Sequence, residues 1–130
     1  IELIETRPAP AVPPRDVDQP PADATRTISG LVYKVLKTGA GTRRPSPRSL
    51  VTVHYTGWTT DGEMFDSSVA RRTPQAFVVG DVIRGWTEGL QLMVEGERRR
   101  FWIPQNLAYD GEVGVPRGML VFDIDLIEIE

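Results

Sequence analysis

The chain has no cysteine, a single histidine and no long apolar run. The lack of cysteine excludes disulfide bonds, thiolate catalysis and cysteine-ligated metal sites. His54 alone cannot form a multi-histidine metal site, so we expect no such centre. No apolar run approaches the roughly 20 residues that a membrane span needs, and no basic-then-apolar signal segment opens the chain. We therefore expect no membrane insertion, and the compartment stays open between cytoplasm and periplasm.

An excess of charge of one sign is also missing. The 130 residues include 15 Lys+Arg and 18 Asp+Glu, a formal net charge of −3. This mild acidity argues against nucleic acid as a partner. Hydrophobic residues make up 40% and charged residues 25%, which is ordinary for a folded domain, and the length suits one compact unit.

Aromatic residues are absent from the first 32 positions, where proline is abundant instead. All ten aromatics lie between Tyr33 and Phe122, whereas six of the eleven prolines fall between Pro8 and Pro21. Such a segment has little apolar surface to bury and favours polyproline II, so we interpret 1–25 as a Pro-rich linker and 26–130 as the folded domain. The opening IELIE nearly repeats IDLIE at 124–128, which favours the hypothesis that 1–5 is the tail of a preceding, similar domain. On this basis we expect a monomer or part of a tandem-domain chain.

Period-two alternation is the dominant signal in the folded part. Residues 51–56 alternate between apolar and polar side chains, which places Tyr55 and His54 on opposite faces of a strand. The Asp61-Gly62 pair that follows predicts a hairpin turn. The apolar alternation changes face near the end of the last strand, which predicts a bulge or two-sided burial there. The other strand candidates are 31–35, 76–79, 98–103 and 119–129.

A single segment, 83–93, has the spacing of a short helix. Trp86, Leu90 and Met93 fall on one face of this segment, although two glycines lower its intrinsic helix propensity. The prediction is therefore an α+β domain of five or six antiparallel strands and one short helix, in which the sheet wraps the helix to bury it.

Three patterns that suggest chemistry have plainer interpretations. The run Gly39–Gly41 lacks the third glycine of a dinucleotide loop and predicts a turn. The basic run 98–100 alternates faces in a strand, so we interpret it as a solvated edge rather than a phosphate site. We interpret the carboxylates of the last strand as surface charge rather than a glycosidase pair; they are Asp123, Asp125, Glu128 and Glu130. His54 lies on the polar face of its strand, where we do not expect direct chemistry.

Four motifs together resemble one known family. They are VTVHYTGWTTDGEMFDSS (51–68), VIRGWTEGLQLMVEGE (82–97), IPQNLAY (103–109) and LVFDIDLIEIE (120–130). In this order they strongly resemble FKBP-type peptidyl-prolyl cis-trans isomerases, over about residues 29–130. The resemblance implies a strongly bent antiparallel sheet wrapped over one short helix, which agrees with the strands and helix inferred above.

The resemblance also implies an apolar pocket for the substrate's prolyl ring, with Trp86 as its floor. The Ile83 N–H and the Tyr109 hydroxyl would donate hydrogen bonds to substrate carbonyls. Asp66 would lie beside the isomerising amide, and Arg71 would pair with it and keep it ionised. The implied catalytic residues are Tyr55, Asp66, Ile83 and Tyr109; the implied substrate-binding residues are Phe65, Phe77, Val82, Trp86 and Phe122.

The implied activity is rotation about X-Pro bonds in protein substrates (EC 5.2.1.8), which assists folding. Peptide-bond rotation has a barrier of ~18–20 kcal/mol because resonance gives the bond double-bond character. No bond is broken, so the reaction needs no nucleophile, metal or cofactor. The expected partners are Pro-containing peptides, unfolded proteins, and macrolides such as rapamycin or tacrolimus. The alternative is a catalytically weak FKBP-fold module that binds Pro-containing segments.

Several positions depart from the family's pattern at the rim of the implied pocket. Gln75 stands where the family usually has an aromatic wall residue, and Asp110 replaces the glycine after the pocket tyrosine. Asp81 alone separates Gly80 from Val82, which shortens the turn into the helix. The 110–121 loop has only twelve residues, with Val115-Pro116 nearest to the family's Ile-Pro. An intact floor with a reduced rim predicts macrolide binding weaker than the family's best.

Overall fold

A computed structural model describes residues 12–130. The strands are β1 (Thr25–Arg26), β2 (Val32–Lys37), β3 (Leu50–Thr59), β4 (Met64–Ser67), β5 (Gln75–Val78), β6 (Arg98–Ile103) and β7 (Leu120–Ile129). Helix α1 (Ser68–Arg71) is a single turn, α2 (Arg84–Leu90) is longer, and short 3-10 turns cover Val79–Asp81 and Gln105–Leu107. The hypothetical domain tail at 1–5 lies outside the described residues. Within them, no helix is both long and apolar enough to span a membrane.

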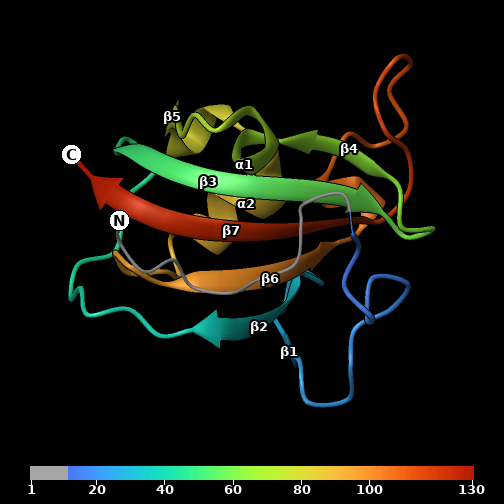
Figure 1. Cartoon of the computed structure of the whole chain (residues 1–130), viewed down its shortest axis with the longest axis horizontal. Helices are drawn as coiled ribbons and strands as arrows, with labels where there is room; N and C mark the ends of the chain where they lie inside the picture. The colour runs from blue at the N-terminus through green and yellow to red at the C-terminus, as the bar shows by residue number, and fades with distance from the viewer. Residues whose placement is uncertain (1–11) are drawn as a thin grey trace.

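All strands belong to one antiparallel sheet with the order β1-β2-β6-β7-β3-β4, and β5 shares an edge of β3 with β4. The ten-residue strands β3 and β7 pair along their length and form its centre. Figure 1 shows the curved strands side by side, with both helices behind them. The predicted α+β fold is confirmed, with seven strands in the described residues instead of five or six and the helix at 84–90 inside the predicted 83–93. The sequence analysis did not anticipate α1.

The predicted bulge in the last strand is present. Thr52 pairs with Glu128 and Val53 with Leu126, so Ile127 has no partner across β3. Ile127 is 45% exposed, whereas Ile129 is buried. The extra residue therefore returns the end of β7 to the core side of the sheet.

Helix α2 packs closely against the concave face of the sheet, and two glycines make this possible. A Cβ atom on Gly85 would lie 2.5 Å from Cγ2 of Ile103, and one on Gly89 would lie 2.7 Å from Cε1 of Phe101. The glycines that weaken the helix in isolation therefore allow it to approach β6 directly. Trp86 and Leu90 extend from the helix into the main core.

A second apolar cluster lies on the opposite face of the sheet, under the N-terminal segment. Val17 is buried there together with Trp58, Trp102 and other side chains. The Trp102 indole N–H donates to the Asp16 carbonyl at 2.9 Å, and the Asp16 carboxylate lies 3.0 Å from Nη1 of Arg100. We call residues 13–24 the N-terminal strap, because this part of the expected linker is docked on the sheet.

The interpretation of residues 98–100 as a solvated edge is wrong. Strand β6 lies between β2 and β7, where every backbone position has a neighbour. Nε of Arg98 lies 2.6 Å from Oδ1 of Asp125, and Nε of Arg100 lies 2.7 Å from Oδ1 of Asp123, so both arginines form ion pairs across the strands. Arg99 is buried on the other face, with its guanidinium 4.6 Å from the centre of the Tyr33 ring. The two aspartates are therefore cross-strand partners of arginines and not merely surface charge.

Candidate active site

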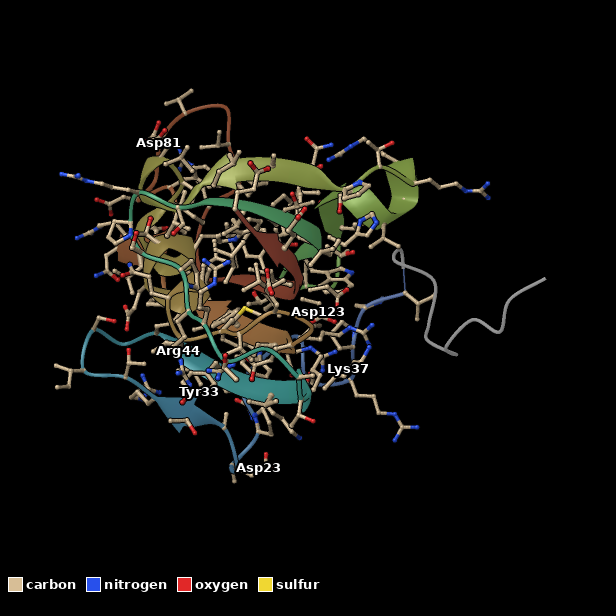
Figure 2. The ribbon with its side chains drawn as sticks, turned by 90° about the vertical axis from the view of Figure 1, so that its left-hand side faces the viewer. Asp23, Tyr33, Lys37, Arg44, Asp81 and Asp123 are labelled. Carbon is tan, nitrogen blue, oxygen red and sulfur yellow. The ribbon has the colours of Figure 1, made fainter. Side chains whose placement is uncertain are left out.

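A pocket of about 290 Å³ opens beside the start of α2. Its lining is mostly aromatic and aliphatic, with two carboxylates; the residues are Tyr55, Phe65, Asp66, Phe77, Asp81, Val82, Ile83, Trp86, Tyr109 and Phe122. The structure thus brings together nine of the residues implied by the family motifs. Asp81 is an addition that the sequence analysis did not assign to the site. In Figure 2, it lies at the opposite end of the molecule from Asp23.

Trp86 is held in the first turn of α2 by three aromatic rings from different strands. Its ring centroid lies 5.1 Å from that of Tyr55, 5.4 Å from Phe77 and 5.3 Å from Phe122. All three pairs are edge-to-face, an arrangement that the aromatic quadrupole favours. Trp86 is only 5% exposed, so the floor of the pocket is largely shielded from solvent.

The wall formed by Phe65 and Phe122 depends on a glycine in β3. The two rings meet edge-to-face with centroids 5.5 Å apart. A Cβ atom on Gly57 would lie 2.7 Å from an atom of each ring. Gly57 follows the alternating run 51–56 directly, and a glycine at that position was the feature of the sequence that could have indicated this close contact.

A hydrogen-bonded network holds Asp66 at the edge of the pocket. The Tyr55 hydroxyl donates to Oδ2 of Asp66 at 2.5 Å, and Nη1 of Arg71 donates to Oδ1. Nη2 of Arg71 also donates to the Tyr55 hydroxyl at 3.1 Å. Burial alone would raise the pKa of Asp66, but the hydrogen bonds from Tyr55 and Arg71 outweigh it and lower that pKa. Asp66 is therefore ionised at neutral pH.

The buried indole N–H of Trp86 and two further hydrogen-bond donors in the lining have no partner within residues 12–130. Ile83 directly precedes α2, and no described carbonyl accepts its backbone N–H. The Tyr109 hydroxyl likewise donates to no described acceptor. Burial, followed by the negative charges of Asp66 and Glu112, raises the pKa of Tyr109, which therefore keeps its proton. The pocket thus combines apolar walls with two donors available to a ligand.

The remaining candidate positions lie outside the lining. Arg71 reaches the site only through Asp66 and Tyr55. Gln75 donates to the Thr73 carbonyl at 3.4 Å and contributes nothing to the walls. His54 is also outside the lining, with Nδ1 2.8 Å from Oγ of Ser68. Within 12–130, no group of three or more histidine, cysteine or acidic residues is arranged to hold a metal ion.

The family model for FKBP-type peptidyl-prolyl cis-trans isomerases matches residues 41–127. The chain belongs to this family. FKBP-type peptidyl-prolyl cis-trans isomerase FkpA of Aeromonas hydrophila is 50% identical over 108 residues, which cover 80% of this chain and 40% of the relative. Macrophage infectivity potentiator of Trypanosoma cruzi is 46% identical over 112 residues, which cover 83% of this chain and 57% of the relative.

Solved structures of FKBP-type relatives have the same architecture. The crystal structure of FkpA from Escherichia coli superposes with a TM-score of 0.78 at 37% identity, covering 85% of this chain and 53% of that one. The structure of a peptidyl-prolyl cis-trans isomerase from Pseudomonas syringae superposes with a TM-score of 0.75 at 33% identity, covering 85% of this chain and 83% of that one. The FKBP-type chain described here spans about half the length of the curated relatives, 40% and 57% for the two named above.

Proposed function

We propose that this FKBP-type chain is a peptidyl-prolyl cis-trans isomerase that accelerates X-Pro rotation in protein substrates and so assists their folding. The observation that carries the proposal is the aromatic pocket on Trp86, with the free donors of Ile83 and Tyr109 in its lining. A prolyl ring is apolar and compact, which suits a pocket of about 290 Å³.

The pocket favours the twisted amide because it stabilises the planar form poorly. A planar X-Pro amide is strongly dipolar, with negative charge on its oxygen, whereas the twisted transition state has lost this resonance. Apolar walls that exclude water therefore disfavour the ground state more than the transition state. The Asp66 carboxylate acts in the same direction, since it repels the negative oxygen of the planar form. A thousandfold acceleration requires only about 4 kcal/mol of such differential stabilisation.

In this mechanism each residue binds or orients the substrate, and none transfers a proton. Trp86 supports the prolyl ring, between walls formed by Phe65, Phe77, Val82 and Phe122. The donors of Ile83 and Tyr109 hold the carbonyls on either side of the reacting bond. Tyr55 and Arg71 keep Asp66 oriented and charged.

The proposed partners are Pro-containing peptides and unfolded proteins, without nucleic acid. We also propose that rapamycin and tacrolimus bind, because the pipecolyl ring of each imitates proline. Their affinity is expected to be below the family's best, since Gln75 and the short 110–121 loop add no apolar wall to the pocket.

The test is isomerisation of a short X-Pro peptide, followed by NMR exchange or by a protease-coupled assay. The proposal requires acceleration by the wild-type chain at catalytic concentrations. Saturable peptide binding without acceleration would instead favour the binding-module alternative, for which the reduced rim of the pocket is the supporting observation. No binding at all would exclude both functions.

A further inference from the structure

One edge of β3 has a gap beside the pocket. Strand β7 covers one edge of β3 throughout, but the other edge is divided between two short strands. β5 pairs with residues 50–53 of β3, and β4 pairs with residues 56–58. His54 and Tyr55 fall between these ladders, so Tyr55 has no strand partner on this side. Tyr55 is also the residue whose hydroxyl holds Asp66.

The buried hydroxyl of Ser68 fills this gap. Tyr55 donates its backbone N–H to Oγ of Ser68 at 2.8 Å, and the same oxygen lies 3.4 Å from the Tyr55 carbonyl oxygen. Nδ1 of His54 lies 2.8 Å from it on another side. Ser68 is fully buried, so water cannot replace the hydroxyl if it is removed.

A serine hydroxyl can accept from the Tyr55 N–H and bond to His54 at the same time. It has one hydrogen to donate and two lone pairs to accept with, one of which takes the Tyr55 N–H. When Nδ1 of His54 is bare, Ser68 donates to it. When Nδ1 carries a proton, Ser68 accepts from it and donates to the Tyr55 carbonyl. The contact therefore persists in every protonation state of His54.

Ser68 is also the first residue of α1, whose last residue is Arg71. The preceding Ser67 caps this turn by accepting the Ala70 N–H at 3.1 Å, and its hydroxyl lies 2.9 Å from that of Thr56. Ser68 thus joins the backbone of Tyr55 to the helix that carries Arg71. These are the two side chains that hold the Asp66 carboxylate.

We propose that Ser68 is a positioning residue of the isomerase site. Its hydroxyl fixes Tyr55 and α1 relative to each other, so that Tyr55 and Arg71 meet on Asp66. The inference rests on the proposed function for its effect on catalysis, but its effect on the Asp66 network can be measured without any activity.

The experiment compares Ser68→Ala with Val121→Ala, a control in the second apolar cluster on the other face of the sheet. Carboxyl NMR titration reports the pKa of Asp66, and peptide exchange reports kcat/KM. In Ser68→Ala we expect the Asp66 pKa to rise toward its ordinary value and kcat/KM to fall about tenfold. In Val121→Ala we expect both quantities to match the wild type despite lower stability. In Ser68→Cys a thiol of similar size, which is a weak hydrogen-bonding group, replaces the hydroxyl, so we expect intermediate values of both quantities. This variant replaces Ser68→Ala in the comparison if the alanine variant does not fold.

Two results would overturn the inference. One is an unchanged Asp66 pKa and kcat/KM in the Ser68 variants; the other is equal changes in Val121→Ala, which would indicate a general loss of stability. If the wild-type chain accelerates no peptide, the proposed function fails. The Asp66 titration still decides the role of Ser68 in that case.

Discussion

Replacing Trp86 with leucine should separate the contribution of the pocket floor to catalysis from its contribution to stability. The indole is 5% exposed and makes three edge-to-face contacts, at 5.1, 5.4 and 5.3 Å. Truncating a buried tryptophan to alanine costs about 3–5 kcal/mol, and leucine refills part of that volume. We therefore expect Trp86→Leu to lower the free energy of unfolding by about 2–3 kcal/mol. A domain with the usual 5–15 kcal/mol of stability remains folded after this loss.

The matched control is Trp102→Leu, because Trp102 is also buried but lies in the second apolar cluster. It should lose a similar amount of stability, including about 1 kcal/mol for the hydrogen bond to the Asp16 carbonyl. Urea unfolding followed by circular dichroism measures stability, and peptide exchange measures kcat/KM per folded molecule. We expect kcat/KM to fall more than tenfold for Trp86→Leu, about 1.4 kcal/mol, and to stay within roughly twofold for Trp102→Leu.

Either of two results would refute this reasoning. If Trp86→Leu loses stability but keeps its kcat/KM, the indole is only a core residue and the apolar floor does not contribute to catalysis. If Trp102→Leu loses as much activity per folded molecule, catalysis follows global rigidity and not the pocket.

Four further predictions follow from the site and the strap. Tyr109→Phe removes one donor and should lower kcat/KM by about three- to tenfold with little change in urea stability, since one hydrogen bond contributes about 1 kcal/mol; an unchanged rate would exclude the hydroxyl from the mechanism. The rate should be flat between about pH 6 and 8, because the lowered pKa of Asp66 keeps it charged and the raised pKa values of Tyr55 and Tyr109 keep them protonated. A step in the rate near pH 6.5 would contradict the flat profile and indicate a titrating histidine. Because the pKa of Asp66 is lower in the folded state, the stability that its charge contributes is present above its unfolded pKa and is lost as pH falls through the folded value. Urea unfolding at a series of acid pH values measures this loss. Deleting the strap, residues 13–24, should lower the free energy of unfolding by about 2–4 kcal/mol, by exposing the Val17 site and unpairing the Trp102 N–H, while kcat/KM is retained. Unchanged stability would show that the strap is a free linker.

The five longer strand candidates and α2 could be predicted because their signals are local, whereas the pocket lining was implied by the family resemblance. Alternation at 51–56 and helical spacing at 83–93 depend on neighbouring residues alone. Most of the pocket residues fall within the four motifs that resemble the FKBP family, although Phe77 and Asp81 lie outside them.

The features that were missed depend on contacts between distant segments. The docking of the strap could not be predicted because Val17 lies in a Pro-rich segment without periodicity, and its site is built from residues of four strands. The arginine–aspartate pairs of β6 and β7 follow from strand register, which alternation alone does not determine. The role inferred for Ser68 depends on a gap between two ladders, and no pattern in the sequence marks such a gap.

The three tryptophans divide between the two faces of the sheet, and this gives the molecule two separate optical reporters. Trp86 forms the pocket floor, whereas Trp58 and Trp102 lie under the strap. A ligand in the pocket should change the emission of the first, and release of the strap should change that of the other two. Replacing Trp86 with phenylalanine, or both others together, would leave one signal for each event. Movement of the strap in the first variant and substrate binding in the second could then be followed separately without an added dye.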